Sequence, residues 1–324
     1  MTTDLRPLRY YLPFAAIVLT GVVTAVFSLD LLDEVLAWWP ATLTMVFGSF
    51  IAGASAEGGG AIAFPVFTLL LKIPPVDARS FSFMIQSVGM VSASLLILGR
   101  GIPVELRAIG WPALSGIVGL LCGTWWVAPY LPPVETKLFF VSLWMAFGIG
   151  LWRANRSRTR TVRPGLPEVL ASKDVVTLLA AGFIGGIVTA IFGNGVDLIT
   201  FCVLTLRYGV DEKVATPTSV VLMSILTVCG FALHALVERD VSENMYHALL
   251  AAAPVVLFFA PLGAFVISKW NRLAIANLLI VIIVVQLLGA LYVLQPSLDH
   301  LALSTGVILA GSGIMRRLDR TKQS

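Results

Sequence analysis

Two acidic residues lie beside glycines inside long apolar stretches of this chain, and these are the groups that could do chemistry. Glu57 precedes three glycines, and Asp197 closes a second run that holds two glycines and an asparagine. The members of the two runs are Gly58, Gly59 and Gly60, and Gly193, Asn194 and Gly195. Glycine weakens a helix by roughly 1 kcal/mol relative to alanine, and a carboxylate at bilayer depth costs about 2.5–3.5 kcal/mol. We therefore expect each run to break a membrane helix at a functional site.

The backbone at such a break determines what it can bind. A half-helix that begins after the break presents unpaired N–H groups and the positive end of its dipole, which together suit a small anion. An ionised carboxyl beside that anion would repel it strongly in a low dielectric. We therefore expect Glu57 or Asp197 to carry a proton when the anion is bound, which would couple transport to protons.

Structural roles are the alternative for the same residues. The glycines would also allow helices to pack closely, and either carboxyl would also cap a half-helix. Hydroxyl and amide groups on neighbouring segments are further candidates for binding the substrate, and hydrogen bonds between helices would use them equally well. These candidates are Ser82, Gln86, Thr218 and Ser219, together with Ser87 and Thr216.

The broken stretch occurs twice. A shift of 137 residues without gaps lays 47–98 over 184–235. Identical residues then include Gly48, Gly58, Ile62, Phe64, Val66, Thr68, Leu69, Ala78, Ser82 and Ser87, which fall on Gly185, Gly195, Ile199, Phe201, Val203, Thr205, Leu206, Ala215, Ser219 and Ser224. In this register Glu57 falls on Asn194 and Gly60 on Asp197, so each break has one acid at a different position. We expect the chain to be a duplicated unit.

Composition indicates an all-α polytopic membrane protein. Hydrophobic residues make up 58% of the chain and charged residues 12%, against about 25% charged in soluble domains. A soluble fold could not bury so many long apolar segments. The excess of Lys and Arg lies in loops, so the basic pI of about 9.1 gives no indication of nucleic-acid binding.

Apolar segments and polar connections divide the chain into five parts. They are an N-terminal span (1–37), a first repeat (38–152), a basic linker (153–173), a second repeat (174–294) and a C-terminal span with a basic tail (295–324). Eight ordinary spans are predicted at 10–29, 81–98, 111–130, 138–152, 219–236, 245–268, 273–294 and 301–315. Each repeat then holds three spans and one broken segment, at 38–72 or 175–206.

The positions of Lys and Arg predict the topology, because short cytoplasmic loops carry them. The linker and the tail are basic, which puts both in the cytoplasm with four ordinary spans between them. The second broken segment must then cross an even number of times, as a re-entrant hairpin does. The acidic loops at 30–34 and 237–244 fall outside, and both termini fall in the cytoplasm. One loop, 72–79, disagrees mildly because it is positive and outside.

The same topology orients the two repeats. The first hairpin enters from outside and the second from the cytoplasm, so we expect two inverted repeats. Inverted repeats whose broken helices meet near the midplane are the architecture of secondary transporters. The sequence therefore predicts secondary transport of a small anion across a membrane.

One spaced pattern carries a family resemblance. A glycine stands ten residues before the triple glycine, and an apolar run with a proline follows, from Gly48 to Pro65. An alanine four residues before a serine comes next, at Ala78 and again at Ala215. The pattern resembles the TauE/SafE sulfite exporter family over nearly the whole chain. The resemblance implies transport of sulfite, organosulfonates or related anions across the bacterial inner membrane. Asn194 and Asp197 depart from it and leave the substrate open.

Two other functional classes remain open. A passive anion channel or uniporter would use the same hairpins without coupling. An intramembrane enzyme would need a nucleophile–base pair or a metal cluster, and the sequence has no Gly-x-Ser-x-Gly and no His-Glu-x-x-His motif. We expect no cofactor and no metal. The expected partners are the anion and membrane lipids, without nucleic acid, and a homo-oligomer stays open.

Overall fold

The structure is a computed structural model that describes residues 8–59, 62, 66–156 and 162–320. Helices and turns make up these residues, with no β-strand among them. Lipid offers no partner to a backbone N–H or C=O group, so helices that satisfy their own hydrogen bonds are the form expected of such apolar segments.

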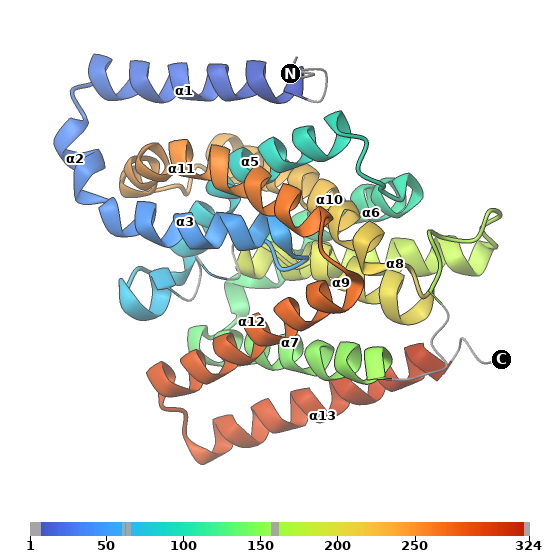
Figure 1. The fold of residues 1–324 in the computed structure, drawn as a ribbon. Helices are drawn as coiled ribbons and strands as arrows, with labels where there is room; N and C mark the ends of the chain where they lie inside the picture. The colour runs from blue at the N-terminus through green and yellow to red at the C-terminus, as the bar shows by residue number, and fades with distance from the viewer. Residues whose placement is uncertain (1–7, 60–61, 63–65, 157–161, 321–324) are drawn as a thin grey trace.

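The helices follow the order shown in Figure 1. The first half of the chain forms α1 (Tyr11–Ser28), α2 (Leu32–Ala37), α3 (Trp39–Ala54), the π-helical turn η2 (Val66–Leu70), α5 (Pro75–Gly99), α6 (Leu106–Trp126), η3 (Ala128–Tyr130) and α7 (Pro133–Arg156). The second half forms α8 (Ser172–Phe192), α9 (Val196–Cys202), η4 (Val203–Arg207), α10 (Glu212–Ala232), η5 (Leu233–Glu238), α11 (Glu243–Ser268), α12 (Arg272–Leu294) and α13 (Leu298–Arg320).

Nine helices in the described part of the chain are long and apolar enough to cross a membrane. Eight of them correspond to the eight predicted spans, so the chain is a multi-pass membrane protein. The ninth is α8, which was predicted as a half-helix and is longer, at 21 residues. Several predicted starts also move, since α5, α6 and α10 begin at Pro75, Leu106 and Glu212 and not at 81, 111 and 219. Proline suits the first turn of a helix, and Asp77 there complements the helix dipole.

The order of the helices repeats with the offset found in the sequence. The first residues of η2, α5 and α6 lie 137 residues before those of η4, α10 and α11. The first helix of each broken segment packs on a helix of the other half, because α8 lies along α6 and α3 lies along α11. Each half therefore covers the broken segment of the other.

Glycines make these two helix pairs possible. In the first pair Gly119 faces the carbonyl of Phe183, and in the second Gly53 faces the carbonyl of Ala260. A side chain at either glycine would overlap the neighbouring backbone. Small residues bring membrane helices this close, where packing has to replace the hydrophobic effect.

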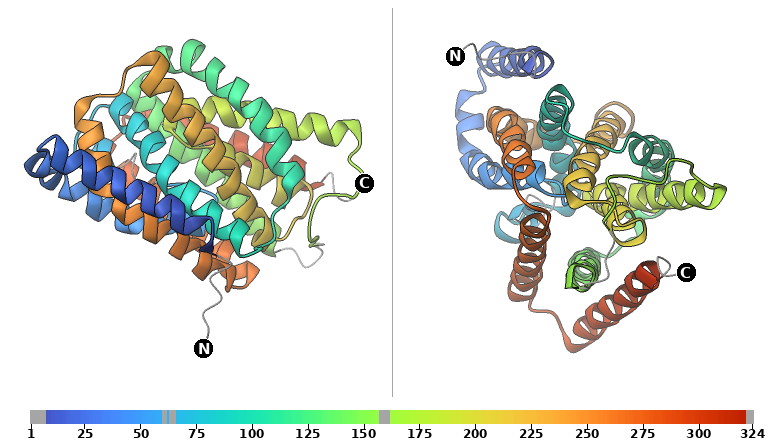
Figure 2. Two further views of the ribbon diagram at one scale, coloured as in Figure 1. Left: turned by 90° about the horizontal axis from the view of Figure 1, so that it is seen from above. Right: turned by 45° about the vertical axis from the view of Figure 1, so that its right-hand side comes forward.

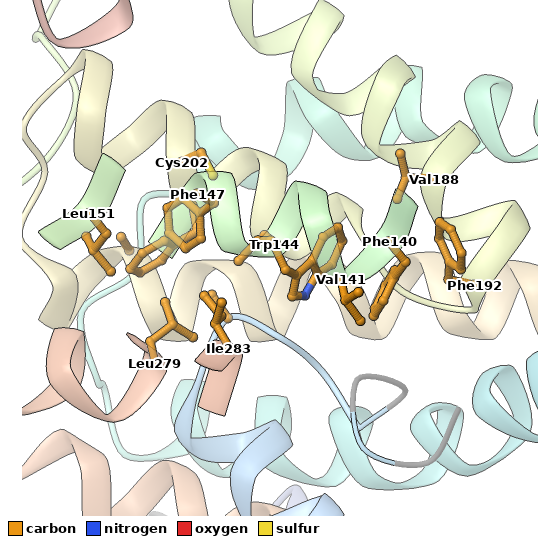
Figure 3. Packing of buried hydrophobic residues seen from close by; sticks show 14 of the residues in the cluster. Phe140, Val141, Trp144, Phe147, Leu151, Val188, Phe192, Cys202, Leu279 and Ile283 are labelled. Carbon is orange, nitrogen blue, oxygen red and sulfur yellow. The ribbon is translucent and has the colours of Figure 1, made fainter. Parts of the chain in front are cut away.

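The remaining helices form the flanks of the molecule. Figures 1 and 2 place α7, α12 and α13 together on one side, with α1 at the opposite edge. Aromatic rings of α7 pack inward, as Figure 3 shows for Phe140, Trp144 and Phe147. Phe140 lies 4.4 Å from the ring of Phe192 at the end of α8, and Phe147 meets Phe201 of α9 edge-on at 5.9 Å. The second break is thus fixed in position against α7.

Candidate functional site

The first helix break follows α3, which ends at Ala54. Ser55 is extended, and its hydroxyl accepts a hydrogen bond from the N–H of Glu57 at 3.3 Å. Gly58 has φ +67°, a left-handed conformation that favours glycine. Gly60 and the half-helix start predicted at Ala61 lie outside the described residues.

The second break follows α8. Gly193 takes the left-handed conformation at the end of the helix, and its N–H donates to Thr189 O at 2.7 Å. Gly195 has φ +148°, after which α9 starts at Val196. The carboxylate of Asp197 accepts from the N–H of Gly195 at 3.0 Å and from that of Leu198 at 2.9 Å. Asp197 thus caps the short helix in the way that the structural alternative predicted.

The two breaks touch each other at equivalent positions. The amide of Asn194 donates to the carbonyl of Glu57 at 2.6 Å, and these residues are one repeat apart. A Cβ added at Gly58 would lie 2.8 Å from Asp197 Oδ2, so Asp197 lies against the first break. Glu57, Asn194 and Asp197 are completely buried. The structure therefore brings the two predicted acids into one enclosed site.

Gln86 of α5 links the two breaks. Its Oε1 accepts from the N–H of Gly59 at 3.2 Å, and its Nε2 donates to Gly193 O at 2.9 Å and to Ser82 Oγ at 2.8 Å. The hydroxyl of Ser82 lies 3.4 Å from the same carbonyl of Gly193. Two of the predicted polar residues thus join this site, which we call the break junction: Glu57, Gly58, Gly59, Ser82, Gln86, Gly193, Asn194, Gly195 and Asp197.

Sequence reasoning missed one contributor, Gln286 of α12. Its Nε2 donates to Glu57 Oε2 at 2.8 Å and so links a distant helix to the junction. Gln286 also lines an apolar groove of about 600 Å³ between α12 and the η2 region. The available signal was an amide in the middle of a helix whose only other charged or amide side chains, those of Arg272 and Asn277, lie near its start. Polar side chains in such places serve as hydrogen-bonding contacts between helices.

The junction is rich in acceptors and poor in free donors. The N–H groups of Gly59, Gly195 and Leu198 are already used, as described above, and that of Val196 donates to Thr189 Oγ1 at 2.9 Å. By contrast, four buried oxygens find no donor within the described residues. They are Glu57 Oε1, Asn194 Oδ1, Asp197 Oδ2 and Gln286 Oε1. A buried acceptor without a donor costs about 1–3 kcal/mol, and more when charged. In this conformation the junction is suited to a proton more than to an anion.

No hydrogen bond within the described chain links the other predicted hydroxyl groups, those of Ser87, Thr216, Thr218 and Ser219, to the junction. The hydroxyl of Ser219 donates to Ala215 O within α10, at 3.0 Å. Thr218 lies beside the loop before α6, where its hydroxyl accepts from the N–H of Glu105 at 2.9 Å. Burial raises the pKa of Glu105, but hydrogen bonds from Arg107 and from the N–H of Leu166 outweigh it and leave that pKa below its ordinary value. The hydroxyl of Thr218 therefore stabilises the loop before α6.

Comparison with known proteins rests on the family alone. No curated protein and no solved structure matches the chain. The sequence model of the family described as sulfite exporter TauE/SafE matches residues 41–290, which cover both breaks and all the helices from α3 to most of α12. The members of this family are membrane transporters, and membership in it implies that a protein exports an anion. The chain belongs to the sulfite exporter TauE/SafE family.

Proposed function

We propose that the chain is a secondary transporter for sulfite or an organosulfonate in the inner membrane, with proton coupling at the break junction. The observation that carries this proposal is the pair of carboxyls. Glu57 and Asp197 come from different repeats, are completely buried and lie at helix breaks that contact each other. Each keeps one oxygen without a donor in the described chain. Two ionised carboxylates in such a place are costly, and a bound proton removes one of the charges.

Contacts at the segment ends support the proposed re-entrant hairpins. Tyr208, after η4, donates its hydroxyl to Asp174 at the start of α8, at 3.0 Å. The ring of Trp38, just before α3, stacks on that of Phe67 in η2 at 6.4 Å. Such contacts between the start and the end of a broken segment are expected of a re-entrant hairpin. The exchange of helices between the halves, and the contact between equivalent positions at the junction, support the inverted arrangement. The cytoplasmic placement of both termini rests on the positions of Lys and Arg.

Flux into liposomes tests both the proposed class of anion and the proposed proton coupling. The full chain is reconstituted and given sulfite, sulfoacetate, sulfate or acetate, with and without a proton gradient. We expect the gradient to drive accumulation of sulfite or sulfoacetate over the other anions. Glu57→Gln and Asp197→Asn keep the shape of the side chain but cannot release a proton. One of the two should retain exchange of the anion and lose its proton-driven accumulation.

An acid far from the junction provides the matched control. Glu34 of α2 is exposed, and Glu34→Gln should transport as the native chain does. Unchanged pH dependence in both junction variants would favour the second candidate, a uniporter or channel. The complete burial of the junction speaks for a carrier, because an open pore would leave these polar groups in contact with water.

A further inference from the structure

A pocket with a buried arginine lies at the start of α5. Its volume is about 130 Å³, and Arg79 and Thr136 are its polar residues. The apolar lining residues are Pro75, Val76, Ala128, Leu131 and Ile191. A cavity needs roughly 10–15 Å³ of such volume to hold one water molecule, so this pocket has room for a small oxyanion. On the proposed topology it faces the side away from the cytoplasm.

The protein satisfies the guanidinium of Arg79 only in part. The residue is 9% exposed, and its Nε has no acceptor within the described chain. Nη1 lies 3.5 Å from Ala190 O and Nη2 lies 3.3 Å from Asp240 Oδ2, both long for hydrogen bonds. A guanidinium offers five N–H groups in a fixed fork that matches two oxygens of an oxyanion. We propose that this pocket binds a small sulfur oxyanion through Arg79, before or after the anion passes the break junction.

The acids near Arg79 have other partners. Asp240 lies 2.9 Å from His234 Nδ1, and Glu238 accepts from the indole N–H of Trp125 at 2.7 Å. The side chain of Asp240 is 33% exposed, and ion pairs near solvent contribute little. An arriving anion therefore competes with Asp240 for Arg79 and leaves the contact between Asp240 and His234 in place.

A line of donors runs from the pocket to the junction. Arg79, Ser82 and Gln86 are spaced by three and four residues, so they share one face of α5. All three reach the end of α8 and the second break, at Ala190 O or Gly193 O. Gln86 then contacts Gly59 of the first break. This face provides a charged group, a hydroxyl and an amide in sequence toward the site of coupling.

The competing interpretation is that Arg79 only fastens the end of α8. A cation near Ala190 O would complement the negative end of that helix. The duplication argues against a purely structural need, because Thr216 stands at the equivalent position of α10 and is buried there. The helix fold thus accommodates an uncharged side chain at this place.

Binding to the full chain in detergent tests the inference without any proton gradient. Sulfite and methanesulfonate are titrated into the native protein and four variants, and affinity is measured by calorimetry. Arg79→Gln should weaken binding by about tenfold or more, the size expected for a charge-assisted hydrogen bond. Asp240→Asn removes the competing charge and should tighten binding several-fold. Val76→Trp should block the pocket without touching the charges, and Arg100→Gln, on an exposed loop residue, should change nothing.

The opposite changes in affinity expected of Arg79→Gln and Asp240→Asn separate the two interpretations. If Arg79 only fastens α8, both Arg79→Gln and Asp240→Asn lower the melting temperature and leave affinity unchanged, which overturns the inference. Should Arg79→Gln fail to fold, Asp240→Asn decides alone, because unchanged or weaker binding contradicts competition for Arg79. No binding of either anion to the native chain would also overturn it. The inference rests on the proposed function only for the class of anion, and Glu57→Gln should leave this binding intact even if coupling fails.

Discussion

The substitution Gly58→Ala tests the geometry of the break junction directly. Gly58 has φ +67°, where a non-glycine residue costs about 1–2 kcal/mol. The added methyl would also lie 2.7 Å from Gln86 Oε1 and 2.8 Å from Asp197 Oδ2, too close for any carbon. Moving Gln86 endangers its bonds to Gly59 and Gly193, each with a net contribution of about 0.5–1.5 kcal/mol. We therefore expect a loss of about 2–5 kcal/mol and at least a tenfold lower rate of sulfite flux.

Alanine substitutions at two other glycines separate the effect of backbone strain from that of steric contact with neighbouring side chains. Gly101 has φ +64° with nothing within 4 Å of an added methyl, so Gly101→Ala carries the backbone strain alone. Gly59 has ordinary φ, and its nearest neighbours would lie at 3.5 Å, so Gly59→Ala should be nearly neutral. Melting temperature in detergent and flux in liposomes are measured for all three. Equal damage from Gly101→Ala and Gly58→Ala, or native flux in Gly58→Ala, would refute the reasoning.

Three further predictions concern other parts of the chain. Gln286→Leu removes the donor to Glu57 and should lower sulfite flux about tenfold with normal expression. The reason is that a hydrogen bond to a charged group contributes about 1.5–3 kcal/mol. Native flux in this variant would show the bond to be dispensable. Glu105→Gln should lower the melting temperature at pH 7. The difference should persist down to the ordinary pKa of a glutamate, about 4.3, and disappear as the pH falls through the lowered pKa of Glu105, because such a carboxyl stabilises the fold only while ionised. A difference independent of pH would contradict this. Cysteines placed at Asp33 and Lys213, both exposed, should react with impermeant reagents from opposite sides of the membrane, and labelling from one side would remove the inverted arrangement.

Local chemistry explains what the sequence could predict. The helical class follows from long apolar segments, and the breaks after α3 and α8 follow from glycines that are clustered beside a polar residue. Single glycines such as Gly53 and Gly119 lie inside helices. Glu57 and Asp197 were recognisable because an acid in an apolar stretch is costly whatever surrounds it. Their placement against one another agrees with the duplication, which puts both acids in equivalent breaks.

Contacts between distant helices explain what could not be predicted. Gln286 meets Glu57 only because α12 passes the first break, and its equivalent in the first repeat, Ile149, gives no hint of the contact. Arg79 was assigned to a loop because the apolar segment was taken to begin after it, although α5 begins at Pro75. The predicted anion donors are occupied because Asp197 caps its own helix, a local bond that competes with a ligand.

The exchange of helices between the two halves has a consequence for how the chain is made. The glycine-lined face of α3 packs mainly on α11, and α8 packs mainly on α6, so each of these helices lies against the other half of the chain. Neither half supplies the main packing partner for the first helix of its own broken segment. During synthesis the first half therefore enters the bilayer with an unsatisfied helix break and has to wait for the second. Assembly of the core is postponed until nearly the whole polypeptide has left the ribosome, and a chain truncated before α11 would remain open at its first break.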